Sequence, residues 1–191
     1  MDPLELTAVV FGIISVFLST REHIGSWPTA LVNTALYFVV LQRAQLYANA
    51  WLQVMYFALS CYGWYAWKRG GAAHAGLVVT RTPARTGALL VVLAACTTLL
   101  VHWILTRFTN SASPWLDAAT TAVSLAAQWM MTRKLLENWG VWCAVNAVYV
   151  GMYLTQGLAL SAALYAVYFG LAVSGHFSWK RSLETRLATI A

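Results

Sequence analysis

Residues 56–69 read YFALSCYGWYAWKR, and residues 168–181 read YFGLAVSGHFSWKR. Sliding the chain along itself until Tyr56 falls on Tyr168 superimposes the two stretches and matches Tyr-Phe, Leu, Gly and Trp-Lys-Arg in the same order. The same shift, here called the repeat shift, also aligns other residues without a gap: Glu5 with Asp117, Trp27 with Trp139, and Tyr37 with Tyr149. Chance supplies aliphatic matches in an apolar chain, but it rarely aligns glycine, tryptophan and paired basic residues together. Because similarity at a fixed spacing indicates repeated structural units, we predict two copies of one unit.

The composition excludes a soluble globular protein. Of the 191 residues, 60% are hydrophobic and 9% are charged, whereas a soluble domain carries about 25% charged residues. A helix needs about 20 apolar residues to cross a bilayer, and lipid leaves only helices or closed barrels as spanning structures. The apolar runs do not alternate in polarity as barrel strands do. We therefore predict an all-α integral membrane protein with seven transmembrane helices, at residues 3–20, 27–43, 46–67, 87–107, 114–133, 139–155 and 158–179.

The lysines and arginines predict the orientation in the membrane. If successive connections alternate between the two sides, one side receives Arg43 and Arg107 alone. The other side receives the remaining ten: Arg21, Lys68, Arg69, Arg81, Arg85, Arg133, Lys134, Lys180, Arg181 and Arg186. Because basic residues favour the cytoplasmic side, we predict a multi-pass protein of the bacterial inner membrane with its N-terminus outside and its C-terminus in the cytoplasm. The net charge of +6 is spread over helix ends and offers no face to nucleic acid, so membrane lipid is the expected partner.

Each copy of the repeat holds three helices, so one additional helix must lie between the copies if both are to insert the same way round. Segment 87–107 fits this role. The predicted organisation is a first three-helix repeat at 1–69, a cytoplasmic loop and inverting linker helix at 70–113, a second three-helix repeat at 114–181, and a cytoplasmic tail at 182–191. This 3+1+3 arrangement of parallel repeats is similar to that of SWEET-type transporters, in which the solute binds near the membrane midplane between the repeats.

The densest group of candidate site residues is Trp139, Trp142 and Asn146, which form the pattern WxxWxxxN. Spacings of three and four place these side chains on one stripe of a helix, where two indoles and an amide could stack on a flat ring and hydrogen-bond its substituents. Trp139 could instead anchor the helix among lipid headgroups, and Asn146 could bond a neighbouring helix. Gln53 has the same two interpretations as Asn146. Weaker candidates of this kind are Tyr149, Asn33, Gln128 and Tyr37.

Glu5 and Asp117 are acids near the outer ends of the first and fifth helices. They could cap these helices, bind a cation or attract a cationic solute, and Asp117 fits a first-turn helix acid best. His102 has no carboxylate on its own helix to form a proton relay. The sequence contains no phosphate loop, no nucleophile triad and no metal-ligand spacing, so we expect no enzyme activity, catalytic residue, cofactor or metal. The three cysteines are predicted to be small buried hydrophobes: Cys61, Cys96 and Cys143.

The pattern at 139–146, preceded by Met131-Thr132-Arg133-Lys134 and Glu137-Asn138, resembles the Pnu family of vitamin transporters. Further matching motifs are Gln45-Leu46-Tyr47-Ala48, Leu52-Gln53-Val54 and Tyr62-Gly63-Trp64-Tyr65-Ala66-Trp67. The PnuC-type nicotinamide riboside transporters are the most similar members, and the resemblance spans nearly the whole chain except the loop at 68–86.

This resemblance implies a relative of the SWEET fold that takes up a dephosphorylated vitamin by facilitated diffusion with alternating access. A cytoplasmic kinase that phosphorylates the imported riboside for NAD biosynthesis is then implied as a functional partner. Carried over to this chain, the substrate contacts would be Trp139, Trp142, Asn146 and Gln53. The two indoles would flank the pyridinium ring, where stacking and cation–π attraction act together.

Several alternatives stay open at this stage. Family members are thought to carry thiamine or riboflavin, which also present flat rings, and the residue spacing does not choose among the vitamins. The tryptophans and amides could serve only helix packing in a membrane scaffold that transports nothing. An intramembrane enzyme would rest on Asp117 and His102 alone. A homo-oligomer also stays open, because lipid-facing and partner-facing apolar surfaces look alike in sequence.

Overall fold

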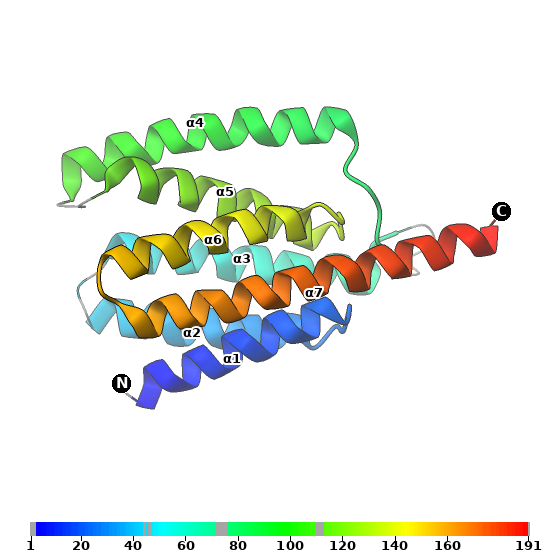
Figure 1. The fold of residues 1–191 in the computed structure, drawn as a ribbon, viewed down its shortest axis with the longest axis horizontal. Helices are drawn as coiled ribbons and strands as arrows, with labels where there is room; N and C mark the ends of the chain where they lie inside the picture. The colour runs from blue at the N-terminus through cyan, green and yellow to red at the C-terminus, as the bar shows by residue number, and fades with distance from the viewer. Residues whose placement is uncertain (1–2, 44, 46, 72–75, 110–112, 191) are drawn as a thin grey trace.

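The computed structural model describes residues 3–43, 45, 47–71, 76–109 and 113–190, and this part of the chain folds into seven α-helices (Figure 1). They are α1 (Pro3–Thr20), α2 (Ser26–Arg43), α3 (Tyr47–Arg69), α4 (Ala84–Phe108), α5 (Pro114–Thr132), α6 (Asn138–Thr155) and α7 (Ala159–Ile190). The predicted all-α class and the seven helical segments are confirmed. Two parts of the predicted pattern lie outside the described residues: Asn110, between the fourth and fifth predicted helices, and Leu46, in one of the matching motifs.

Helix α7 is longer than the predicted segment 158–179, because it continues to Ile190. Neither glycine nor proline follows Gly175 to end the helix, and Lys180 pairs with Glu184 one turn further on at 3.9 Å. Figure 1 shows the C-terminal end of α7 extending past the other helices. The predicted tail at 182–191 is therefore helical over its described residues.

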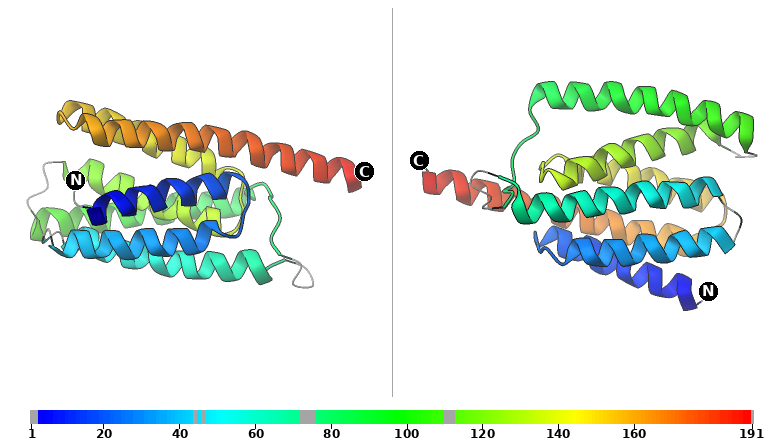
Figure 2. Two further views of the ribbon diagram at one scale, coloured as in Figure 1. Left: turned by 90° about the horizontal axis from the view of Figure 1, so that it is seen from below. Right: turned by 180° about the vertical axis from the view of Figure 1, so that it is seen from behind.

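Six of the helices form a closed circuit in which each packs against two others of the six. The order around the circuit is α1, α2, α3, α5, α6, α7 and back to α1. Helix α4 lies outside it against α5, and none of its described side chains is buried (Figures 1 and 2). The first three helices and the last three thus occupy separate halves of the bundle, which meet where α3 packs on α5 and α7 packs on α1.

The turns that connect α1 to α2 and α5 to α6 are built alike. Glu22 and Lys134, which the repeat shift superimposes, both have positive φ angles, of 54° and 52°. The N–H of Glu22 donates to the Ser19 carbonyl and the N–H of Lys134 donates to the Met131 carbonyl, both at 3.1 Å. A left-handed residue at this position lets the chain leave the first helix and reverse. Both turns lie at the end of the bundle where α1, α3 and α5 finish, which we call the basic end.

The two halves also exchange equivalent hydrogen bonds at the basic end. The indole N–H of Trp67 in α3 donates to the Met131 carbonyl at 3.1 Å. The indole N–H of Trp179 in α7 donates to the Ser19 carbonyl at 2.9 Å. The repeat shift superimposes the two donors, and it superimposes the two acceptors as well. Each half therefore satisfies a carbonyl at the end of the other half's first helix.

Three of the described helices, α1, α4 and α7, are long and apolar enough to cross a membrane by length and composition. The other four fall short of that hydropathy because the interior-facing positions of these helices carry hydroxyls, amides and aromatic rings. Helix α5, for example, buries Thr120, Ser124 and Thr132. That α2, α3, α5 and α6 also span the bilayer stays a prediction.

Candidate functional site

Four tryptophans close the interior of the bundle at the basic end. Trp27 meets Trp67 edge-on with ring centroids 5.2 Å apart, and Trp139 meets Trp179 in the same way at 5.3 Å. Trp67 and Trp179 join the two pairs at 5.9 Å. Three of the four rings are at most 2% exposed: Trp27, Trp139 and Trp179. This tryptophan cluster is therefore a close-packed plug between the two halves.

The predicted stripe of α6 is present, but its members differ in burial. Trp139 is 1% exposed and belongs to the tryptophan cluster, so it lies inside the bundle and not at a headgroup surface. Trp142 is half-buried and packs against the cluster from one turn away. Asn146 is buried a further turn from the basic end. The stripe thus changes from pure packing at Trp139 to a partly accessible indole at Trp142.

Two tyrosines cross the interior near the middle of the helices. The Tyr56 hydroxyl of α3 lies close enough to the Ser124 side chain of α5 to interact with it. The Tyr168 hydroxyl of α7 lies against Gly12 of α1, where a Cβ atom would stand 2.6 Å from the tyrosine oxygen. Each tyrosine therefore reaches the first helix of the opposite half, and the repeat shift superimposes these two contacts as well.

The amide candidates lie in different surroundings. Asn33 donates from Nδ2 to the Ala8 carbonyl of α1 at 2.7 Å, so at least this part of its side chain ties two helices together. Gln53 is half-buried and, with Thr34 across from it, lines a groove of about 350 Å³ between α2 and α3. Gln128 is half-buried on α5. Gln53 and Gln128 thus keep partly accessible amides, whereas Asn33 uses one of its donors in helix packing.

A group of tyrosines that the sequence analysis did not anticipate lies between α6 and α7. The ring centroid of Tyr165 lies 4.6 Å from that of Tyr149, 5.3 Å from that of Tyr153 and 5.9 Å from that of Tyr168. The Tyr149 hydroxyl also lies close enough to the Thr120 side chain of α5 to interact with it. Because the chain has nine tyrosines, a single one is weak evidence for a site. Their spacing of four on α6 and three on α7 is the signal that could have indicated a cluster.

The two predicted acids lie at the end of the bundle where α1 and α5 begin. Glu5 is in the first turn of α1 and Asp117 is in the first turn of α5. Glu5 lies close enough to the Tyr37 hydroxyl to interact with it electrostatically, and Asp117 interacts likewise with Tyr149. The bundle therefore carries negative charge beside tyrosine hydroxyls at the end opposite the tryptophan cluster.

Other residues considered for chemistry lie apart from these groups. His102 of α4 stacks on Trp115 of α5 with ring centroids 3.7 Å apart. Cys61 and Cys96 are exposed, so the prediction that they are buried is wrong, because the membrane-facing sides of the helices are as apolar as the core. Cys143 is half-buried against the tryptophan cluster. Within the described residues, no three His, Cys, Asp or Glu side chains are grouped to hold a metal ion.

The loop between α3 and α4 lies across the turn between α5 and α6. The N–H of Thr80 donates to the Lys134 carbonyl at 3.1 Å, and the N–H of Leu136 donates to the Thr80 carbonyl at 2.9 Å. This pair of bonds forms an isolated parallel bridge between Thr80 and Leu135. A single bridge leaves no periodic pattern in the sequence, so residues 68–86 are recognisable there only as a loop.

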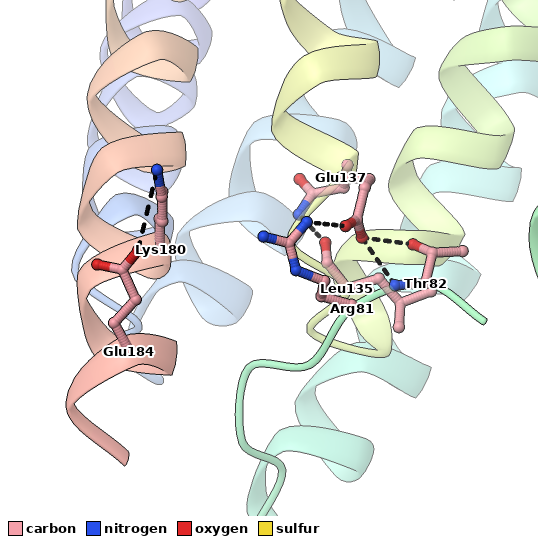
Figure 3. Close-up of polar contacts among 7 residues, drawn as sticks. Arg81, Thr82, Leu135, Glu137, Lys180 and Glu184 are labelled. Atoms are coloured by element: carbon pink, nitrogen blue, oxygen red, sulfur yellow. Dashed lines mark hydrogen bonds and ion pairs between the residues drawn. The ribbon is translucent and has the colours of Figure 1, made fainter. Parts of the chain in front are cut away.

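Side chains strengthen this attachment (Figure 3). Thr82 donates to the Glu137 carboxylate from its N–H at 2.8 Å and from its hydroxyl at 2.7 Å. Arg81 lies 3.6 Å from the same carboxylate. Partial burial alone would raise the pKa of Glu137, but the hydrogen bonds and the charge of Arg81 outweigh it and hold the pKa of this carboxyl below its usual value. The loop is therefore fastened to Glu137 in its ionised form.

Comparison with known proteins connects this arrangement to transporters. The family model for nicotinamide mononucleotide transporters matches residues 2–181. The nicotinamide riboside transporter PnuC of Escherichia coli is 26% identical over 208 residues, which cover 96% of this chain and 87% of that protein. The riboflavin/roseoflavin transporter RibM of Streptomyces davaonensis is 28% identical over 179 residues, which cover 92% of this chain and 83% of that protein.

The fold itself is shared with a solved structure. A crystal structure of the vitamin B3 transporter PnuC matches with a TM-score of 0.75 and 23% identity, covering 95% of this chain and 82% of that chain. These relatives are named as transporters and not as enzymes, in agreement with the expectation from the sequence. Together with the apolar helices they show a multi-pass membrane protein. Because the family model spans nearly the whole chain, the protein belongs to the nicotinamide mononucleotide transporter family.

Proposed function

We propose that this protein takes up nicotinamide riboside across the bacterial inner membrane by facilitated diffusion. Membership of the nicotinamide mononucleotide transporter family carries the proposal. The relative from Escherichia coli, which is named a nicotinamide riboside transporter, supports the riboside as the substrate. A cytoplasmic kinase would then trap the imported riboside for NAD biosynthesis, because a phosphate group adds about two negative charges that oppose return through an apolar path.

The proposed transport cycle rests on two parallel three-helix repeats within seven transmembrane helices, as in SWEET-type transporters. The repeats would be residues 1–69 and 114–181, with residues 70–113 as cytoplasmic loop and inverting linker helix and residues 182–191 as cytoplasmic tail. The closed circuit of six helices with α4 outside supports this division, as do the equivalent hydrogen bonds of Trp67 and Trp179. Rocking of one repeat against the other would open the interior to each side in turn, with the N-terminus outside.

The proposed substrate site lies between the tryptophan cluster and the tyrosine group. Trp142 offers a partly accessible indole to the pyridinium ring, where cation–π attraction is worth about 0.5–2 kcal/mol. Asn146 lies one turn further along α6 and would hydrogen-bond the carboxamide or the ribose hydroxyls. Trp139 would support Trp142 from within the cluster. The remaining proposed contacts are Gln53, Tyr149, Asn33 and Gln128.

Charge at the outer end supports the riboside over its phosphorylated form. Glu5 and Asp117 place two acids beside tyrosine hydroxyls of the interior. Such an entrance attracts a cationic pyridinium ring and repels a phosphate group. Lys134, a buried cation that could balance a phosphate, lies at the opposite end and is paired with Glu22.

Riboflavin is the second candidate substrate, because the riboflavin/roseoflavin transporter RibM is similar over 92% of this chain. Uptake by the purified protein in liposomes separates the candidates. We expect labelled nicotinamide riboside to equilibrate with the external concentration in the absence of any ion gradient. Excess nicotinamide mononucleotide, thiamine or riboflavin should leave this uptake unchanged. Riboflavin uptake that the riboside does not inhibit would favour the second candidate, and no uptake of either vitamin would reject the proposal.

A further inference from the structure

An ion pair between Glu22 and Lys134 joins the two halves. Lys134 Nζ lies 2.9 Å from Glu22 Oε2, and the two side chains are 9% and 22% exposed. Glu22 belongs to the turn between α1 and α2, and Lys134 belongs to the turn between α5 and α6. The repeat shift superimposes the two residues, and they share the same left-handed backbone conformation. A contact between equivalent points of two related halves lies on the axis that relates them, so this ion pair sits at the centre of the basic end.

The ion pair lies directly over the tryptophan cluster. Lys134 Nζ stands 4.5 Å from the centroid of the Trp67 ring, which is within the range of cation–π attraction. Trp67 in turn contacts Trp179 across the boundary between the halves. Charge and aromatic packing thus close the same point of the interior in two successive layers, first the ion pair and then the rings.

The turn that carries Lys134 and the turn that carries Glu22 differ in how they are attached to the rest of the protein. The Lys134 turn is bound to the loop of α3 and α4 through Thr80 and through the Thr82–Glu137 hydrogen bonds. At the Glu22 turn the residue that corresponds to Glu137 is Gly25, which has no side chain to accept such bonds. The described backbone bonds of that turn run to its own neighbours in the chain. The Glu22 side of the closure is therefore the one with fewer attachments.

We propose that Glu22 and Lys134 form the gate of the transport path at its basic end, with the Glu22 turn as the moving side and the loop-bound Lys134 turn as the fixed side. The inference rests on the proposed function, because it assigns a gate to alternating access between the two halves. An ion pair suits this role. Breaking this largely buried pair while water enters returns both charges to water, and the regained hydration offsets much of the lost attraction. Separated apolar surfaces would instead be driven to close again.

Thiol labelling tests the gate without any substrate. Ser19, at the end of α1 beneath the pair, is 8% exposed and becomes a reporter as Ser19→Cys in a background where the three native cysteines are alanine. In inside-out vesicles, Glu22→Gln and Lys134→Gln should raise the rate of labelling by a soluble maleimide about fivefold, as expected for about 1 kcal/mol. The charge exchange Glu22→Lys with Lys134→Glu should return the rate to that of the parent. Unchanged labelling in the single variants, or no recovery in the exchange, overturns the proposal.

The pair formed by Lys180 and Glu184 gives a matched control. It lies at the same end of the bundle but within α7, so it joins no two halves (Figure 3). Lys180→Gln and Glu184→Gln should therefore leave the labelling of Ser19→Cys unchanged. An increase equal to that of Glu22→Gln would show a general effect of charge and would overturn the proposed gate.

A reversible cross-link tests the gate even if the single variants fold poorly. Cysteines at positions 22 and 134, bridged by a short bifunctional reagent that contains a disulfide, should stop uptake until dithiothreitol cleaves the bridge. The same bridge between positions 180 and 184 should leave uptake intact. Undiminished uptake through the bridged 22–134 protein overturns the gate. If none of the tested vitamins is transported, the proposed function fails, and the labelling result still decides the gate.

Discussion

Gly175 lies directly against the indole ring of Trp139: a Cβ atom on this glycine would stand 2.6 Å from the ring. Gly63 contacts Trp27 in the same way, with a Cβ distance of 2.3 Å. Both values are below the 3.0 Å that real Cβ contacts respect, so an alanine at either position must displace a buried ring. The tryptophan cluster therefore depends on the close approach of α3 to α2 and of α7 to α6, which only glycine permits.

Replacing Gly175 with alanine should destabilise the protein by about 1–3 kcal/mol, the usual cost of overpacking a buried site. Gly63→Ala should act similarly. Gly170→Ala is the matched control on α7, because a Cβ there meets nothing within 4 Å. The thermal midpoint of the detergent-purified protein should fall for the first two variants and stay the same or rise for the third. Equal midpoints for Gly170→Ala and Gly175→Ala would contradict this account of the contact.

The indole hydrogen bonds across the halves should also contribute to stability. Trp179→Phe removes the N–H that donates to the Ser19 carbonyl at 2.9 Å. That carbonyl keeps its bond from the Glu22 N–H, so the expected loss is that of one hydrogen bond, about 0.5–1.5 kcal/mol. Trp67→Phe should give a loss of the same sign, because its N–H donates to Met131. Trp64→Phe on the exposed face of α3 serves as control. A control that loses as much stability as the buried variants would show that indole size, and not the hydrogen bond, matters.

Alanine variants of Trp139 and Trp142 should differ in their effects, with one lowering stability and the other weakening substrate binding. Trp142→Ala should weaken nicotinamide riboside binding about tenfold, the equivalent of about 1.4 kcal/mol of stacking and cation–π attraction, with a thermal midpoint near that of the parent. Trp139→Ala should instead cost about 3–5 kcal/mol of stability, because it empties a fully buried ring. Calorimetric titration and thermal unfolding of both variants check the two expectations. Binding that survives Trp142→Ala would remove this indole from the proposed site.

The attachment of the loop to Glu137 should depend on pH. Hydrogen bonding holds the pKa of this carboxyl below its usual value in the folded protein, so its stabilising effect is complete at neutral pH and is lost as pH falls below the usual value of about 4.3. Hydrogen exchange at the amides of Thr80 and Leu136, corrected for intrinsic rates, should lose protection over that range. Glu137→Gln should weaken protection at neutral pH and remove the dependence, whereas Glu184→Gln should change neither. Protection at Thr80 that is insensitive to both pH and Glu137→Gln would contradict this role.

Helix positions could be predicted because each segment is largely apolar and is bounded by turn residues. Segment 3–20 coincides with α1, and segment 114–133 differs from α5 by one residue. The extension of α7 was missed because its last turns are polar, and length and hydropathy alone do not show that Lys180 and Glu184 continue the helix. Hydropathy predicts where a chain can cross a membrane, but it does not show how far a helix runs beyond it.

The surroundings of the candidate residues could not be predicted from spacing. The pattern on α6 places Trp139, Trp142 and Asn146 on one stripe, and the structure agrees. However, whether an indole on that stripe is packed or accessible depends on the opposing helix. Gly175 lets α7 cover Trp139, and the residue spacing on α6 does not predict this contact. The contact of Glu22 with Lys134 could not be predicted either, because the two residues lie in separate turns and meet only in the assembled fold.

Helix α4 packs against α5 and leaves none of its described side chains buried. Most of its side chains are exposed, so lipid constrains the sequence of this helix more than its protein neighbours do. On the exposed side of this helix, one aliphatic residue can replace another without disturbing its contact with α5. Over evolutionary time this helix should accept substitutions faster than the six that enclose the interior, keeping its apolar character while its individual residues drift.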